Sequence, residues 1–183
     1  MPDSDENFDE QVLRSMARWP DVPACYGWLS LDRRGRWLIQ GEVISHAGAI
    51  GFLGRNYAVD ERGCWFVQNG PQRAFVALEY APWIIRFDRD AGFSTHTQRK
   101  VQAVTAVFSD ENGNIFLGTE HGCGLLDDRD LAAFAEQLDE AAEPIEFDWQ
   151  RYRLPIQEIA ATALETQFGF VAEPQAPPGD DAA

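Results

Sequence analysis

The sequence predicts an α+β protein whose antiparallel sheets form two interlocked hairpin–helix–sheet units with flanking helices. This fold class follows from three observations: short apolar runs alternate with turn residues, the helical patterns are brief and amphipathic, and one turn motif recurs along the chain. Apolar runs bounded by Gly, Pro, Asn and Asp are typical of strands. At 183 residues, the chain is long enough to bury a core without disulfides.

The expected sheet is organised around the stretch 56–87. It contains the apolar runs CWFVQ, RAFVALE and WIIRF, separated by the breakers DERG, NGPQ and YAP. That arrangement predicts an antiparallel meander of three strands. Because successive side chains of a strand point to opposite faces, RAFVALE places apolar residues on both faces. We therefore expect helices or a second sheet to cover both faces, at least over part of their area.

The remaining elements are shorter. Apolar residues recur every three or four positions over 8–18, which predicts an amphipathic helix that Pro20 ends. We expect further helices over 47–56 with Ser45 or His46 as the cap, over 127–141 as the clearest helix, and from Pro155 to Gly169. Further strands are expected in a hairpin over 26–40, an extended segment at 93–99, a hairpin around 110–113 and a strand at 145–149.

One turn motif, D-x-x-G followed by an aliphatic or aromatic run, occurs in SLDRRGRWLIQ, AVDERGCWFVQ and FSDENGNIFLG. Two interpretations stay open, because the motif is a favoured turn in any antiparallel protein and is also the mark of a duplicated unit. We expect one compact domain over 8–172, with 25–100 and 101–172 as the halves of a duplication. The acidic segment 1–7 and the Pro-rich acidic tail 173–183 are expected to be disordered.

The net charge of −15 is concentrated toward the ends of the chain. The first ten residues hold five acids and no base, and residues 127–183 hold fourteen acids and three arginines. An acidic chain repels phosphate backbones and anionic lipid, so we expect neither nucleic acid nor a membrane as a partner. No secretory signal or long apolar window is present, and we expect a cytoplasmic location. Alternatively, the acidic C-terminal part sequesters a basic partner as a mimic of nucleic acid.

A small hydrolase or thiol enzyme is the catalytic alternative. Cys64 or Cys123 would be the nucleophile, activated by His46, His96 or His121. A zinc site would draw on His121 and Cys123 with His46 or His96. Structural sites usually have two short-spaced pairs and only one is present, so we predict no metal and no cofactor. Motifs for phosphate loops, dinucleotide binding, serine hydrolases and zinc proteases are absent from the sequence, and a non-enzymatic protein is the first interpretation.

A binding surface is that first interpretation. The segment GRNY leaves the predicted helix over 47–56, QNGPQR forms a polar hairpin tip, and one arginine projects from the apolar run WIIRF. Loops held on a rigid sheet commonly carry recognition of a partner or small ligand. The alternative is that NGPQ is simply a good turn and that the arginine pairs with an acid such as Glu79. The candidate binding residues are Arg55, Asn56, Tyr57, Gln68, Asn69, Gln72, Arg73 and Arg86.

The segments WPDVPACYGWLSLDRRGRW and IGFLGRNYAVDERGCWFVQNGPQR resemble a family of uncharacterised proteins from beta-proteobacteria, a domain of unknown function, over most of 16–87. The order of GRW, a helix, DERG, an aromatic strand and EYAPWI is similar to another uncharacterised bacterial family. The repeated helix-and-sheet fold of that family has been suggested to serve signal transduction. These resemblances imply a fold and a signalling accessory role, and neither implies catalytic residues.

Overall fold

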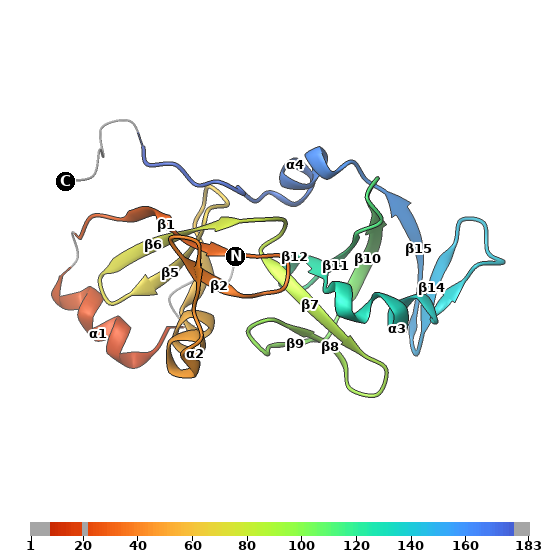
Figure 1. Cartoon of the computed structure of the whole chain (residues 1–183), viewed down its shortest axis with the longest axis horizontal. Coiled ribbons are helices and arrows are strands. Elements are labelled where there is room, and N and C mark those ends of the chain that lie inside the picture. Colours follow the sequence, from red (N-terminus) through yellow and green to blue (C-terminus); the bar gives the residue numbers. More distant parts are fainter. Residues whose placement is uncertain (1–7, 20–21, 178–183) are drawn as a thin grey trace. The chain divides into compact units, whose positions relative to one another are not determined.

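The computed structural model describes residues 8–19 and 22–177 and confirms the α+β fold class, with two mixed sheets and short helices (Figure 1). The chain divides into two compact units. The first comprises the described residues up to Asp32, then Arg36–Glu79 and those from Phe170 onward; the second comprises Arg33–Gly35 and Tyr80–Gly169. None of the described helices combines the length and apolarity needed to cross a bilayer.

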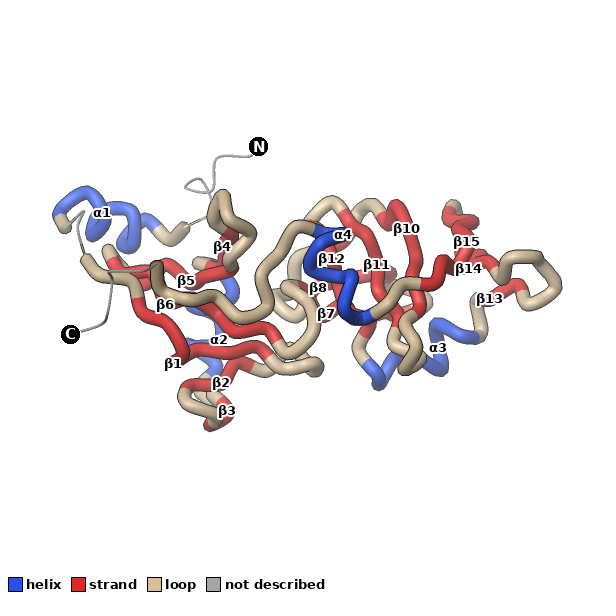
Figure 2. The backbone as a smooth tube through the Cα atoms, turned by 90° about the horizontal axis from the view of Figure 1, so that it is seen from above, coloured by secondary structure: helices blue, strands red, loops and turns tan. Residues whose placement is uncertain are grey.

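The first unit contains a sheet in the order β3-β2-β1-β6-β5-β4. Its central pair, β1 and β6, runs parallel, while every other neighbouring pair is antiparallel. Figure 2 shows β1 beside β6 and β2 beside β3. Two helices accompany the sheet. The elements are α1 (Glu10–Arg18), β1 (Cys25–Leu31), β2 (Trp37–Ile39), β3 (Glu42–Val43), α2 (Ala47–Arg55), β4 (Tyr57–Val59), β5 (Trp65–Asn69) and β6 (Gln72–Leu78).

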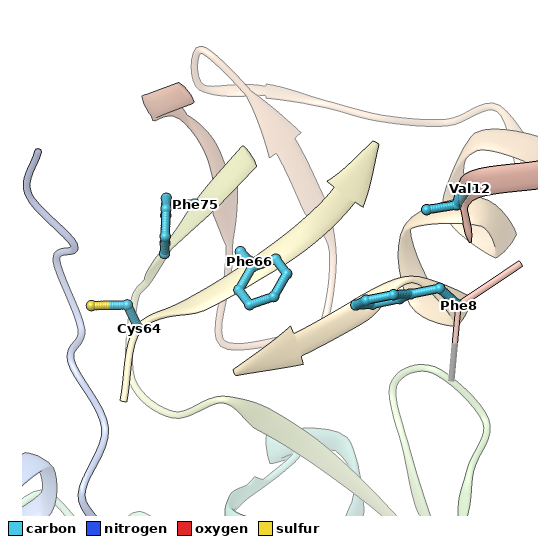
Figure 3. Packing of buried hydrophobic residues seen from close by; sticks show 5 residues of the cluster. All are labelled: Phe8, Val12, Cys64, Phe66 and Phe75. Carbon is cyan, nitrogen blue, oxygen red and sulfur yellow. The ribbon is translucent and has the colours of Figure 1, made fainter. Parts of the chain in front are cut away.

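Both faces of this sheet are buried over β5 and β6, as the sequence predicts. Consecutive residues Phe75 and Val76 of β6, which point to opposite faces, are both buried. Phe75 pairs with Phe66 on the face that packs against Phe8 and Val12 at α1 (Figure 3). Phe8 precedes the N-cap residue Asp9 and Val12 lies in the first turn of α1, so both reach the sheet from the start of the helix.

The second unit contains a sheet in the order β13-β14-β15-β10-β11-β12-β7-β8-β9. The pairs β10·β15 and β7·β12 run parallel. Its elements are β7 (Trp83–Asp88), β8 (Gly92–Thr95), β9 (Lys100–Val101), β10 (Val104–Ser109), β11 (Ile115–Thr119), β12 (Gly122–Leu126), the 3₁₀ turn η2 (Asp128–Asp130), α3 (Leu131–Ala135), β13 (Leu138–Asp139), β14 (Glu146–Trp149), β15 (Tyr152–Glu158), the 3₁₀ turn η3 (Ala161–Ala163) and α4 (Leu164–Phe168).

This second sheet curls around an aromatic core. Phe87 of β7 lies 6.1 Å, between ring centroids, from Phe147 of β14, although four strands separate β7 from β14 in the sheet. Phe134 of α3 stacks on Phe147 at 4.4 Å and lies 6.0 Å from Phe87. The rings thus fill the concave side of the sheet, where twist brings distant strands together.

The same order of elements occurs twice. In the first unit, three strands, a helix and three strands run from β1 to β6, and the first and last strands pair in parallel. In the second unit, three strands, a helix and three strands run from β10 to β15, and again the first and last pair in parallel. The meander β7-β8-β9 stands outside this correspondence.

The recurring D-x-x-G motif has one geometry at all three positions. The carboxylates of Asp32, Asp60 and Asp110 each accept a hydrogen bond at 2.8 Å from the backbone N–H four residues later. The glycine of each motif has a positive φ, between 72° and 81°, which a residue with a Cβ rarely adopts. The motif is therefore a stable turn in its own right.

Two pairings differ from the predicted antiparallel arrangement. The run WIIRF is β7 and is not the third strand of the meander with β5 and β6, because the free edge of β6 pairs in parallel with β1. β7 instead pairs with β8 and, in parallel, with β12. Both sheets are accordingly mixed rather than antiparallel.

Two predicted helices are also wrong in extent. The helix expected over 127–141 covers only η2 and α3, because Leu138 leaves it to pair with Phe147 of β14. The segment expected to begin a helix at Pro155 is β15, in which only residues from Ile156 onward pair with β10. Pro155 is tolerated there because its missing N–H falls outside that paired stretch.

The other predicted elements are confirmed. Helices α1 and α2, the hairpins β1-β2, β5-β6 and β10-β11, the extended strand β8 and the strand β14 lie where the patterns place them. His46 caps α2 by accepting from Ala49 N–H at 3.2 Å, and Gly169 closes α4 with a φ of 66°. Segment 1–7, Pro20 and residues 178–183 of the acidic tail lie outside the described residues.

Candidate functional site

Both candidate thiols are buried in apolar surroundings. Cys64 belongs to the packed cluster of the first unit, and burial, assisted by the Asp60 carboxylate, raises the pKa of its thiol. Cys123 lies on β12 in the second unit, where burial raises the pKa of the thiol to about 12. A thiol with a raised pKa carries little thiolate near neutral pH, so this geometry does not favour a nucleophilic role.

One histidine, His46, belongs to the first unit, whereas His96 and His121 belong to the second. His46 is exposed at the start of α2. His96 and His121 flank Trp83 in the second unit, each with a ring-centroid distance of 5.7 Å, and His121 lies 3.0 Å from the backbone oxygen of Lys100. Among residues 8–19 and 22–177, no group of three His, Cys, Asp or Glu is placed to hold a metal ion.

Two residues of the segment GRNY, Arg55 and Asn56, bond to Asp9, the N-cap residue of α1. Asn56 is fully buried; its side chain accepts from Asp9 N–H at 2.9 Å and donates to Phe52 O at 2.9 Å. Arg55 pairs with the Asp9 carboxylate at 3.0 Å. Tyr57 is buried, and burial raises the pKa of its hydroxyl well above its ordinary value. These three predicted binding residues thus serve the fold of the first unit.

The Asp9–Arg55 pair predicts a pH dependence of stability. Hydrogen bonding from Arg55 lowers the pKa of Asp9 in the folded state, so the pair stabilises above the unfolded-state pKa, about 3.9, and that contribution is lost as pH falls through the lower folded pKa. We expect Asp9→Asn to lower the urea midpoint near neutral pH and to approach the parent protein at an acidic pH below the folded-state pKa of Asp9. The check is urea unfolding at both pH values; an equal difference at both would contradict the prediction.

Two glutamines of the polar hairpin tip donate hydrogen bonds to backbone oxygens. Gln68 is buried and donates to Gly70 O at 2.9 Å, and Gln72 donates to Pro23 O at 3.0 Å. Asn69 is exposed at the end of β5. Of the residues predicted here, Arg73 lines a cleft.

Arg86 has a partner other than Glu79. Its guanidinium makes two hydrogen bonds, at 2.6 and 3.0 Å, to the carboxylate of Asp130, which also accepts from Phe87 N–H at 2.9 Å. The ion pair therefore ties η2 to β7. Arg86 also borders a hollow of about 400 Å³, together with Lys100 and Gln98.

The first unit holds an open cleft of about 440 Å³ with an aromatic floor. Phe66 and Phe75 lie opposite each other on β5 and β6, and the ring of Tyr26 stacks on Phe75 at 4.5 Å with an interplanar angle of 8°. The guanidinium of Arg73 lies 4.5 Å from the centroid of Phe66, and that of Arg62 lies 5.6 Å from the centroid of Phe75. Two cations thus stand over two adjacent rings.

The two arginines of the cleft differ in their partners: among the described residues, Arg62 forms an ion pair, and Arg73 does not. Arg62 pairs with Asp60 at 3.0 Å and also reaches the Tyr26 hydroxyl at 3.4 Å. The hydrogen bonds to Tyr26 and Asp60 raise the pKa of Arg62, so it stays a cation. Arg73 is exposed, and within the described part of the chain no carboxylate lies within ion-pair distance of it. Arg73 is accordingly the cation placed to meet a ligand, with Glu61 at the rim.

Sequence reasoning found Arg73 and missed Tyr26, Arg62, Phe66 and Phe75. The signal was partly present, since Arg73 and Phe75 alternate on one strand and share a face. The pairing of β5 with β6 adds Phe66 to that face, and the pairing of β1 with β6 brings Tyr26 to it. Those pairings join distant segments and are not visible in a local pattern.

Comparison with known proteins gives a family and a fold. The model of a family described as "Protein of unknown function (DUF2946)" matches residues 8–175. A comparison with curated protein sequences gives no match. The crystal structure of a DUF1285 family protein from Silicibacter pomeroyi DSS-3 is similar with a TM-score of 0.56 at 12% identity, covering 75% of this chain and 84% of that one. One from Shewanella baltica OS155 has a TM-score of 0.46 at 18% identity, covering 63% and 92%. At 12% identity the first likeness concerns the fold alone.

Proposed function

We propose that this chain, which belongs to the family of proteins of unknown function (DUF2946), is a non-enzymatic protein that binds a small aromatic carboxylate in the cleft of its first unit. The Arg73 guanidinium, which lies 4.5 Å from the centroid of Phe66 and beside the stacked rings of Tyr26 and Phe75, carries the proposal. The volume of the cleft, about 440 Å³, falls within the range of small-molecule sites.

The chemistry of the lining supports an anion on a flat apolar body. A guanidinium stacked on a ring keeps its in-plane N–H groups free to meet a carboxylate in a two-point contact. The partly exposed ring of Tyr26 offers apolar area to a flat ring, and it rests on the ring of Phe75, which is itself buried. Because Asp60 already pairs with Arg62, the ligand's negative charge falls to Arg73.

The test is a titration of the full chain with indole-3-acetate, followed by ligand-observed NMR. Indole-3-acetamide, which has the same ring without the charge, is the matched ligand. We expect the acid to bind at least about tenfold more tightly than the amide, and Arg73→Gln to remove that preference. Arg14→Gln, at an arginine that is 78% exposed on α1, is the control and should leave binding unchanged.

Equal binding of the acid and the amide, or an unchanged preference in Arg73→Gln with the fold intact by circular dichroism, would refute the proposal. No binding of either compound at millimolar concentration would refute the aromatic-carboxylate class.

The proposed binding site is compatible with a signalling role. A cytoplasmic signalling accessory, as the resemblance to the repeated helix-and-sheet family implies, would use such a cleft to sense a small metabolite. The raised pKa values of Cys64 and Cys123 give the thiol-enzyme alternative no support. The basic-partner alternative concerns another surface, in the second unit.

A further inference from the structure

The second unit carries an apolar groove of about 890 Å³. It lies between the β10-β11 turn, the segment from β13 to β14, and the end of β15. Aliphatic and proline side chains dominate its floor and walls: Ile115, Leu138, Pro144, Ile145, Ile156 and Ile159. The side chain surface of Ile145 is 44% exposed, one of the larger apolar exposures among the described residues. Grouped apolar exposure of this kind marks an interaction site more often than a scattered residue does.

The rim of the groove is acidic. Glu111 and Glu158 are exposed in its lining, Asp110 is in the lining but buried, and no Lys or Arg lines the groove among the described residues. Burial raises the pKa of Asp110, but hydrogen bonds from Asn114 and Asn112 outweigh this and lower the pKa, so it stays ionised. Glu111 is held in place by accepting from Ala161 N–H at 3.0 Å. The negative rim disfavours nucleic acid and anionic lipid as occupants.

Backbone hydrogen bonds fix the segments that line the groove. Ile156 N–H donates to Ile145 O at 2.8 Å, and Ile159 N–H donates to Ser109 O at 3.0 Å. Pro144 has no N–H with which to extend the pairing of its segment along β15. The groove is thus lined by the segment before β14 and by the end of β15.

We propose that this groove docks a short segment of a partner protein that presents two or three aliphatic side chains flanked by Lys or Arg. The aliphatic side chains meet the isoleucine-rich floor, and the cations meet the acidic rim. This partner site is separate in residues and chemistry from the aromatic cleft of the first unit.

The test uses three labelled heptapeptides and fluorescence anisotropy on the full chain. The peptide KRIVIRK has both features, EEIVIEE keeps the apolar centre with reversed charge, and KRSGSRK keeps the charge without the apolar centre. We expect KRIVIRK to bind at least about tenfold more tightly than either of the others, and its affinity to fall as salt screens the rim.

Matched variants locate the site. Ile145→Asp places a charge in the groove and should weaken KRIVIRK binding by about tenfold or more. Ile39→Asp, at a 47% exposed isoleucine of the first unit, is the control and should leave binding unchanged. Glu158→Arg should weaken binding of KRIVIRK and improve that of EEIVIEE, whereas Glu42→Arg on β3 should do neither.

Three outcomes would overturn the proposal. Equal binding of KRIVIRK and KRSGSRK would mean unspecific charge attraction, and equal losses in Ile145→Asp and Ile39→Asp would place the peptide elsewhere. A concentration-dependent dimer of the parent protein that Ile145→Asp abolishes would make a second copy of the chain the occupant. Because indole-3-acetate binding is measured on a different unit, failure here leaves the proposed function standing, and the reverse also holds.

Discussion

Replacing Phe147 with Ala is expected to lower the free energy of unfolding of the second unit by about 3–5 kcal/mol, the usual loss for a buried phenylalanine. The side chain is fully buried and stacks on Phe134 at 4.4 Å with an interplanar angle of 2°. It also lies 6.1 and 6.0 Å from the rings of Phe87 and Phe93. Truncation would leave a cavity where β14 meets β7 and β8, and rigid rings on all sides limit its collapse.

The measurement is urea unfolding, with hydrogen exchange to locate the effect. Phe168→Ala is the matched control, because Phe168 is half-buried and, among the described residues, its ring lies beside one aromatic ring, Phe108, at 5.4 Å. We expect a clearly smaller loss there, and faster exchange in β7, β8 and β14 only for Phe147→Ala. A loss below about 1 kcal/mol for Phe147→Ala would contradict a shared aromatic core.

The sequence could predict the elements that show the two-residue alternation of a strand or a recognisable turn motif. The alternation of Ile145, Phe147 and Trp149 with acids predicted β14 because side chains of a strand alternate between faces. The D-x-x-G turns were predictable because each is closed within five residues by its own aspartate. Both signals are local, and neither depends on the rest of the fold.

Strand partners could not be predicted, because they join residues far apart in the chain. The run WIIRF has the same sequence pattern whether it pairs with β6 or with β12. The strands of the parallel pairs β1·β6 and β10·β15 are not joined by a hairpin turn that could be recognised in the sequence. The segment 127–141 has a helical apolar stripe, yet pairing of Leu138 with Phe147 overrides that preference.

The site was predicted only in part for the same reason. Arg73 stood out as a cation on an exposed hairpin, but its ring partner Phe66 depends on strand register. Asn56 and Tyr57 stood out as polar groups after a helix, and their burial shows that such groups also serve as internal hydrogen-bonding and packing residues. A polar residue beside a turn is therefore ambiguous until its burial is known.

Asp130→Ala is expected to lower the free energy of unfolding of the second unit by about 2–3 kcal/mol. The carboxylate is largely buried, holds both nitrogens of Arg86 that face it, and accepts from the buried N–H of Phe87 at 2.9 Å. Its loss would leave that N–H without its acceptor. Because the Arg86 side chain is 46% exposed, water can resolvate the guanidinium, so the effect falls below that of removing one partner of a fully buried pair.

A double-mutant cycle separates these contributions in urea unfolding. Arg86→Ala is expected to lose less than Asp130→Ala, because Asp130 would keep its bond to Phe87 N–H. The double variant should resemble Asp130→Ala alone, since the pair is already broken there. Asp90→Ala, at an exposed aspartate of the β7-β8 turn, is the control and should change stability by less than about 0.5 kcal/mol. If Asp130→Ala were no more destabilising than Asp90→Ala, the ion pair would not be what holds η2 against β7.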